Sequence, residues 1–145
     1  MKFSNYGQSL FEVVIAVGII GIIVFSVVAL ATTSIRNTTF TKNNSSATQL
    51  AQDAVEWLRG ERDNDWVAFH TNAGSPIYCL DTSSWAKARA CNPGEYISNT
   101  ILTREVTFSG VSGNQVSATV NVYWTDSQGT HQAATSTVFT DWRSR

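Results

Sequence analysis

Residues 12–31 have the sequence EVVIAVGIIGIIVFSVVALA, in which one carboxylate, Glu12, precedes a long aliphatic run. From Val13 to Ile35 the chain has no charged residue. About 20 apolar residues are enough for a helix to span a bilayer. A carboxylate inside lipid costs roughly 2.5–3.5 kcal/mol on insertion scales, so such a residue usually has a partner. The stretch therefore predicts a membrane-length helix with an acidic group near its start.

The segment before this run is short and polar. Residues 1–7 are MKFSNYG, with Lys2 as the only positive residue, which is a weak cue that this end lies on the cytoplasmic side. A secretory signal is normally cut after its apolar stretch, at small residues, and the stretch is lost. Here the small residue, Gly7, precedes the stretch. A cut after Gly7 would leave the apolar helix at the N-terminus of the mature chain.

The order of polar leader, Gly7, Glu12 and apolar run resembles the prepilin signal of type IV pilins and type II secretion pseudopilins. The resemblance implies that prepilin peptidase, a membrane-embedded aspartyl peptidase, cuts between Gly7 and Gln8 and methylates the Gln8 amine. It also implies that Glu12 meets the N-terminal amine of a neighbouring subunit and so sets the register of assembly. The alternative is an uncleaved signal anchor with Glu12 at the membrane interface.

Gln8 departs from the family pattern, because mature chains of this family usually begin with Phe or Met. A free N-terminal Gln can cyclise and lose the amine that Glu12 would meet. Methylation after cleavage would oppose cyclisation. The sequence leaves open whether Gln8 is methylated or cyclised.

Composition predicts a small extracytoplasmic domain after the apolar run. Roughly 100–110 residues remain there, enough for one modest core. The formal net charge is −1, and no dense basic patch suggests nucleic acid. Outside the cytoplasm Cys79 and Cys91 are expected to form a disulfide, which stabilises by roughly 3 kcal/mol in the loop-entropy model, rather than to remain two thiols. A metal site is not expected, since neither Cys has a second ligand at suitable spacing.

The middle of the chain continues the first helix. The segment 32–46 contains mediocre helix formers but no Gly or Pro. From residue 47 the apolar residues Leu50, Ala54, Trp57 and Leu58 recur on one helical face, and Gly60 is placed to end the helix. The expected organisation is a leader over 1–7, an apolar helix over 8–35, an amphipathic half over 36–60 and a globular β domain over 61–145.

Alternation of apolar and polar residues predicts three strands in the C-terminal half. They are Leu102–Phe108, Gln115–Trp124 and Thr130–Thr140, joined by turns at 110–114 and 126–129. Short connections imply an antiparallel meander that covers the apolar face of the helix. The predicted fold class is α+β, with a long N-terminal helix packed on a small antiparallel sheet. This plan is also that of the pilin fold.

Segments 58–66, 120–131 and 140–143 loosely resemble PilV-type minor pilins and I-type pseudopilins in their aromatic and turn placement. The resemblance favours a minor subunit over a major pilin. It implies a cytoplasmic-membrane precursor with its globular domain outside, later part of a pilus or pseudopilus. The expected partners are other pilin subunits, prepilin peptidase, the inner-membrane assembly platform and membrane lipid before assembly. The sequence does not separate a type IV pilus from a secretion pseudopilus.

Catalytic residues, metal ligands and cofactors are not expected. His70 and His131 are expected in a loop and near a turn, and the segment 63–65 (DND) lacks the spacing of a calcium loop. Trp66, Trp85 and Trp142 fall in predicted loops or the tail, where local packing is the default and an adhesive surface the alternative. A signal-anchored binding or adhesion module and a DNA-uptake subunit remain alternatives. DNA uptake would need a basic exposed surface, and Lys87 and Arg89 are the only close basic pair in the loop between Cys79 and Cys91. This is weak support for DNA binding.

Overall fold

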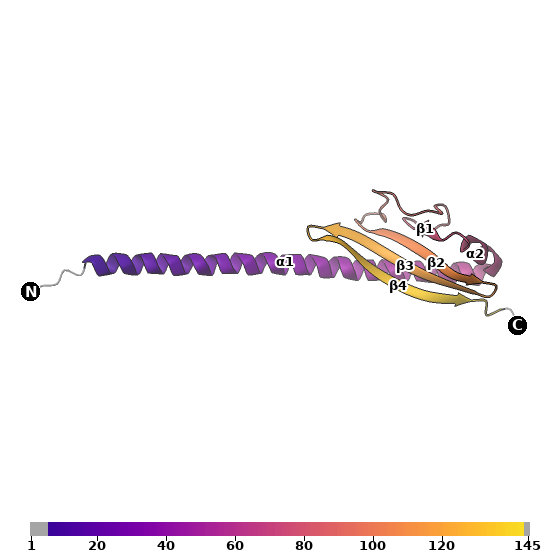
Figure 1. The fold of residues 1–145 in the computed structure, drawn as a ribbon, viewed down its shortest axis with the longest axis horizontal. Coiled ribbons are helices and arrows are strands. Elements are labelled where there is room, and N and C mark those ends of the chain that lie inside the picture. The colour runs from indigo at the N-terminus through magenta and orange to yellow at the C-terminus, as the bar shows by residue number, and fades with distance from the viewer. Residues whose placement is uncertain (1–5, 144–145) are drawn as a thin grey trace, which may run out of the picture. The chain divides into compact units, whose positions relative to one another are not determined.

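The apolar run belongs to one long helix. The computed structural model describes residues 6–143, with side chains from Leu10 onward, and its helix α1 comprises Tyr6–Asn64 (Figure 1). The predicted continuation through the polar segment is confirmed. There several Thr hydroxyls donate to backbone carbonyls four residues earlier, as Thr33 does to Ala29 and Thr38 to Ser34. These bonds satisfy side chains that would otherwise compete with the helix for backbone groups.

The chain divides into two units, one ending at Thr41 and one beginning at Lys42. The first consists, in its described part, of helix α1 alone, and most of the predicted leader, residues 1–5, lies outside the described residues. The second unit holds the remainder of α1 together with all the other elements. The predicted α+β class, a long N-terminal helix packed on a small antiparallel sheet, is confirmed.

The prediction that Gly60 ends the helix is wrong. Helix α1 continues to Asn64, and Gly60 does not adopt the left-handed conformation of a helix-ending glycine. A second helix, α2 (Trp66–Asn72), follows almost at once, and the Asp65 carboxylate caps it by accepting from the Ala68 amide at 3.0 Å. Trp66 and His70, expected in a loop, therefore lie on a helix.

The described residues include four antiparallel strands, which form one sheet in the order β1-β2-β3-β4. They are β1 (Ile77–Cys79), β2 (Thr103–Ser112), β3 (Gln115–Asp126) and β4 (Gly129–Thr140). The three predicted strands are confirmed, and the short β1 was missed. It pairs with the middle of β2, where Tyr78 lies opposite Val106.

The two long hairpins differ in regularity. Strands β3 and β4 pair without interruption from Gln115 opposite Thr140 to Asp126 opposite Gly129. The pairing of β2 with β3 shifts register between Ser109 and Ser112. Gly110 (φ 57°) lies within this irregular part of β2, whereas a turn was predicted to begin there. Glycine tolerates this backbone conformation because it has no Cβ.

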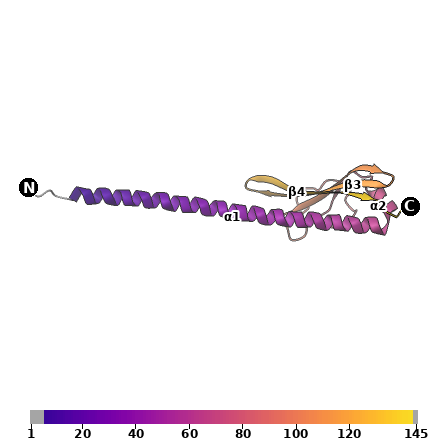
Figure 2. The same ribbon diagram turned by 90° about the horizontal axis from the view of Figure 1, so that it is seen from below.

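The core lies between α1 and one face of the sheet. Figure 2 shows these as two layers, with the sheet on one side of the Lys42–Asn64 half of the helix. The predicted helical face is buried, with Ala54 and Leu58 fully enclosed and Leu50 and Trp57 partly so. Alternate residues of the strands meet that face. The buried strand residues include Val106, Phe108, Val116, Ala118, Val120, Val122, Trp124 and Phe139.

Candidate functional site

The first candidate site is the apolar surface of α1. The large apolar side chains from Leu10 to Leu30 are exposed, with Leu10 at 70% and Phe25 at 77% of their full accessibility. Among the described residues, α1 is the one helix long and apolar enough to cross a membrane. Such a surface is covered in its working state by lipid or by protein. It is compatible with a membrane anchor.

Gly7, Gln8 and Glu12 all lie near the start of α1. Gln8 and Glu12 are four residues apart in α1, about one helical turn. Glu12 is exposed and has no ion-pair partner within residues 10–143. Glu12 is thus an exposed carboxylate on the apolar surface of α1. Cleavage at Gly7 and methylation of Gln8 stay predictions.

A disulfide between Cys79 and Cys91 closes the segment after β1, as predicted. Cys79 is buried at the end of β1, and its amide donates to the Lys87 carbonyl at 3.0 Å. The Cys91 amide donates to the Glu105 carboxylate on β2 at 2.7 Å. The loop is therefore held by a hydrogen bond from Cys79 to one of its own carbonyls and by a hydrogen bond from Cys91 to strand β2.

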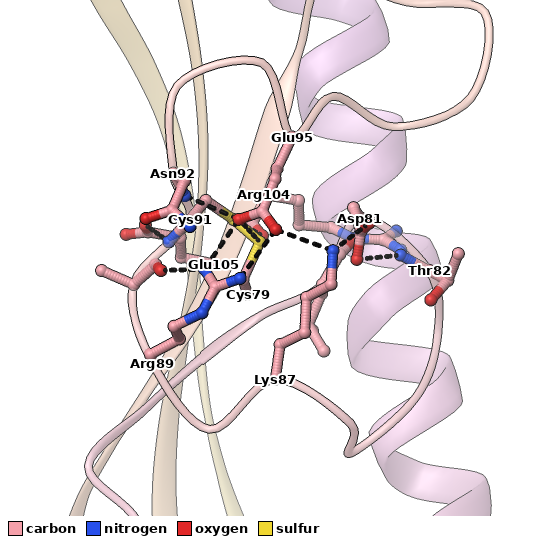
Figure 3. Close-up of a disulfide and its surroundings, with 12 residues drawn as sticks. Cys79, Asp81, Thr82, Lys87, Arg89, Cys91, Asn92, Glu95, Arg104 and Glu105 are labelled. Carbon is pink, nitrogen blue, oxygen red and sulfur yellow. Dashed lines mark hydrogen bonds and ion pairs between the residues drawn. A yellow bond between two sulfur atoms is a disulfide. The ribbon is translucent and has the colours of Figure 1, made fainter.

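The carboxylate of Glu95 organises the charges of this loop (Figure 3). It accepts two hydrogen bonds from the Arg89 guanidinium, at 2.7 and 2.8 Å, and one from Lys87 Nζ at 2.9 Å. The Asn92 amide also donates to it, at 2.6 Å. Lys87 in turn donates to Asp81 at 2.6 Å. Both basic residues of the loop are thus engaged by carboxylates.

These contacts shift the titration of the groups involved. The Arg89 guanidinium, Lys87 and the Asn92 amide hold the pKa of Glu95 far below its usual range, because each favours the ionised carboxylate. Hydrogen bonds to Asp81 and Glu95 raise the pKa of Lys87. With its cations committed to neighbouring carboxylates, the loop offers little positive surface to a nucleic acid.

Arg104 is a charged residue on the buried face of β2, with 4% of its surface exposed. Its guanidinium donates to the carbonyl of Leu80 at 3.1 Å and to that of Leu50, on α1, at 3.0 Å. Burial lowers the pKa of Arg104, an effect that the more distant Asp53 and Asp81 oppose. One side chain thus links the helix, the sheet and the loop after β1.

Trp85 fixes the middle of the disulfide loop to the core. Its ring lies 4.9 Å from that of Trp57 and 5.1 Å from that of Tyr78, measured between centroids, and its indole N–H donates to Glu61 at 2.7 Å. Trp66 packs against Phe69 in the same way. These two tryptophans therefore contribute to local packing, the default expectation for them.

Trp142 is more exposed than Trp66 and Trp85, at 59% of its full accessibility. Its indole N–H nevertheless donates to Asp63 at 3.1 Å, which joins the C-terminal tail to the end of α1. Asp63 also accepts from Arg62. The acidic segment 63–65 thus caps a helix and holds the tail.

The two histidines lie in different places. The His70 ring on α2 is hydrogen-bonded to the Ser112 carbonyl, and the His131 ring on β4 lies 3.0 Å from the Asp126 carboxylate.

Cys79, Cys91 and Glu95 come close enough to suggest a metal site by distance alone. The two sulfurs are bonded to each other, so they are not thiolate ligands.

Comparisons with known proteins add no family. No protein-family model matches the chain, and neither the search of curated proteins nor that of solved structures finds a similar protein.

Proposed function

We propose that this chain is a minor pilin or pseudopilin, a structural subunit that assembles into a filament through its N-terminal helix. The carrying observation is the exposed apolar surface of α1 from Leu10 to Leu30, with Glu12 near its start. The precursor would be anchored in the cytoplasmic membrane with its globular domain outside, and it would be cut after Gly7.

The proposed assembly step moves this apolar surface from lipid into contact with the same surface of other subunits. Glu12 has no ion-pair partner among the described residues, and in the filament it would meet the Gln8 amine of the adjacent subunit. A subunit out of register would leave a buried charge without its partner, which is strongly unfavourable. The pairing would therefore select one axial position.

The test replaces Glu12 in cells that hold the assembly machinery. We expect Glu12→Ala to be processed normally but to fall by about tenfold or more in sheared filaments, a change equivalent to about 1.4 kcal/mol. Glu56→Ala is the matched control, because Glu56 is an exposed carboxylate on the other half of the same helix. Equal recovery of both variants in filaments would exclude the role of Glu12 in assembly.

A further inference from the structure

Strand β4 is a long edge of the sheet with one strand neighbour, β3, in the described chain. In an antiparallel pair, every second residue directs its N–H and C=O groups away from its neighbour. Strand β4 pairs with β3 along its whole length, from Gly129 to Thr140, without a bulge. Strand β4 lies at the edge of the sheet in Figure 1, and its outer side is therefore a regular row of backbone donors and acceptors.

This edge lacks the devices that usually prevent strand pairing. Proteins protect exposed edges with Lys or other charges, Pro, bulges or very short strands. Residues 129–140 have the sequence GTHQAATSTVFT, without Pro, Lys, Arg, Asp or Glu. The side chains of its outer face, from Gln132 to Val138 at every second position, are exposed. They are small or uncharged, so they would not repel an added strand.

The opposite edge of the sheet carries the short strand β1, which covers Glu105–Thr107 of β2. Strand β1 has only three residues, and the Cys79 amide already donates to the Lys87 carbonyl of the disulfide loop. Among the described residues, β4 is thus the longer continuous edge of the sheet.

We propose that β4 accepts an extended, uncharged segment of a different polypeptide as a fifth strand. Main-chain hydrogen bonds would supply affinity, and the hydroxyl-rich outer face would favour small and β-branched side chains. The same face already joins its strands by such contacts, since the hydroxyls of Thr119 and Ser136 are 2.9 Å apart.

A second copy of this chain is the less suitable occupant, on an argument that rests on the proposed function. Antiparallel pairing of two β4 strands about a two-fold axis would reverse the Lys42–Asn64 helix of one copy relative to the other. Subunits of the proposed filament run in one direction. The partner strand therefore comes from another protein.

The test uses the full chain in detergent and a labelled synthetic peptide with blocked ends, TSVTASTVTQST, an uncharged strand of small and β-branched residues that is not a segment of this chain. Binding is measured by fluorescence anisotropy. Two further peptides carry N-methyl groups on alternate residues, one on odd and one on even positions. Because only one set of N–H groups faces the sheet, one methylated peptide should lose about tenfold or more in affinity and the other should bind.

Variants of the protein complete the test. The double variant Ala134→Lys and Ser136→Lys places charges on the edge strand and should abolish binding. Asn121→Lys is the matched control, because Asn121 lies opposite Ala134 on β3, one strand in from the edge. It should bind the peptide as the unchanged protein does.

Two results would overturn the inference. One is that the unmodified peptide fails to bind, or that both methylated peptides bind equally. The other is a β4–β4 dimer of the full chain, detected as disulfide cross-linking of single cysteines placed at positions 132–138. Failure of peptide binding with normal cleavage after Gly7 would remove the strand-addition surface while leaving the pilin proposal intact.

Discussion

Arg104 shows how one buried cation is accommodated without a carboxylate in contact. Its guanidinium donates to the carbonyls of Leu80 and Leu50, so it holds the loop after β1 and helix α1 to strand β2. A hydrogen bond from a charged donor is stronger than one between neutral groups. The residue therefore acts as a link between three elements.

We predict that Arg104→Ala lowers the free energy of unfolding by about 2–4 kcal/mol, through lost hydrogen bonds and a new cavity. Urea denaturation in mild detergent, followed by tryptophan fluorescence, measures this change. Arg59→Ala is the control, since Arg59 is exposed on α1 and, within the described part of the chain, pairs only with Glu56. Its effect should stay within about 0.5 kcal/mol. Equal effects of the two substitutions would contradict the linking role.

Glu95 makes the stability of the disulfide loop depend on pH. Arg89 and Lys87 depress the pKa of its carboxyl in the folded chain, whereas in the unfolded chain it titrates near the ordinary value of about 4.3. Its contribution is therefore fully present above that value and is lost as the pH falls below it. Unfolding measured from pH 6 down to pH 3 should show a steeper loss for the unchanged protein than for Glu95→Gln. Parallel curves would contradict this assignment.

At the scale of elements, Gly60 is a helix-interior glycine that the fold does not require. A Cβ at this position would meet nothing, and the residue does not adopt a positive φ. Glycine in a helix interior costs about 0.5–1 kcal/mol relative to alanine. Gly60→Ala should raise the free energy of unfolding by that amount, as measured by urea denaturation.

At Gly129 the same substitution by alanine should have the opposite effect. It begins β4 with a φ of 126°, a conformation that side chains rarely adopt. Gly129→Ala should therefore lower the free energy of unfolding by about 1–3 kcal/mol. A stabilising effect at position 129, or a destabilising one at position 60, would be inconsistent with the observed backbone.

The elements with strong periodicity could be predicted from the sequence, and those fixed by tertiary contacts could not. The apolar run and the alternation within Gln115–Trp124 are long patterns, and such periodicity indicates the type of secondary structure without knowledge of tertiary contacts. Strand β1 has three residues, too few to show a period, and it exists through pairing with β2. Helix α2 was missed because its capping residue, Asp65, stands in a polar segment that resembled a loop.

Some residues of the candidate sites could also be predicted from the sequence, and others could not. The disulfide was predictable from two cysteines in a chain expected outside the cytoplasm. The cluster around Glu95 was not, because its members are brought together by loop closure rather than by a spacing. Arg104 did leave a signal, as a charge within the apolar alternation of Leu102–Phe108.

At the scale of the whole molecule, the two units suit different surroundings. From Leu10 to Leu30, α1 presents apolar side chains outward, whereas the part from Lys42 encloses its own core beneath a polar outer sheet face. The exposed apolar surface needs lipid or protein around it. An N-terminal helix that can exchange one for the other is what the proposed pilin function requires.

The mass of the N-terminal peptide tests this account most directly. The chain would be expressed with an active prepilin peptidase, with an inactive one, and as Gly7→Val with the active enzyme. We predict a chain beginning at Gln8, with the mass of one added methyl group, only in the first case. An N-terminus at Met1 in all three cases would contradict the account and indicate a signal-anchored surface domain.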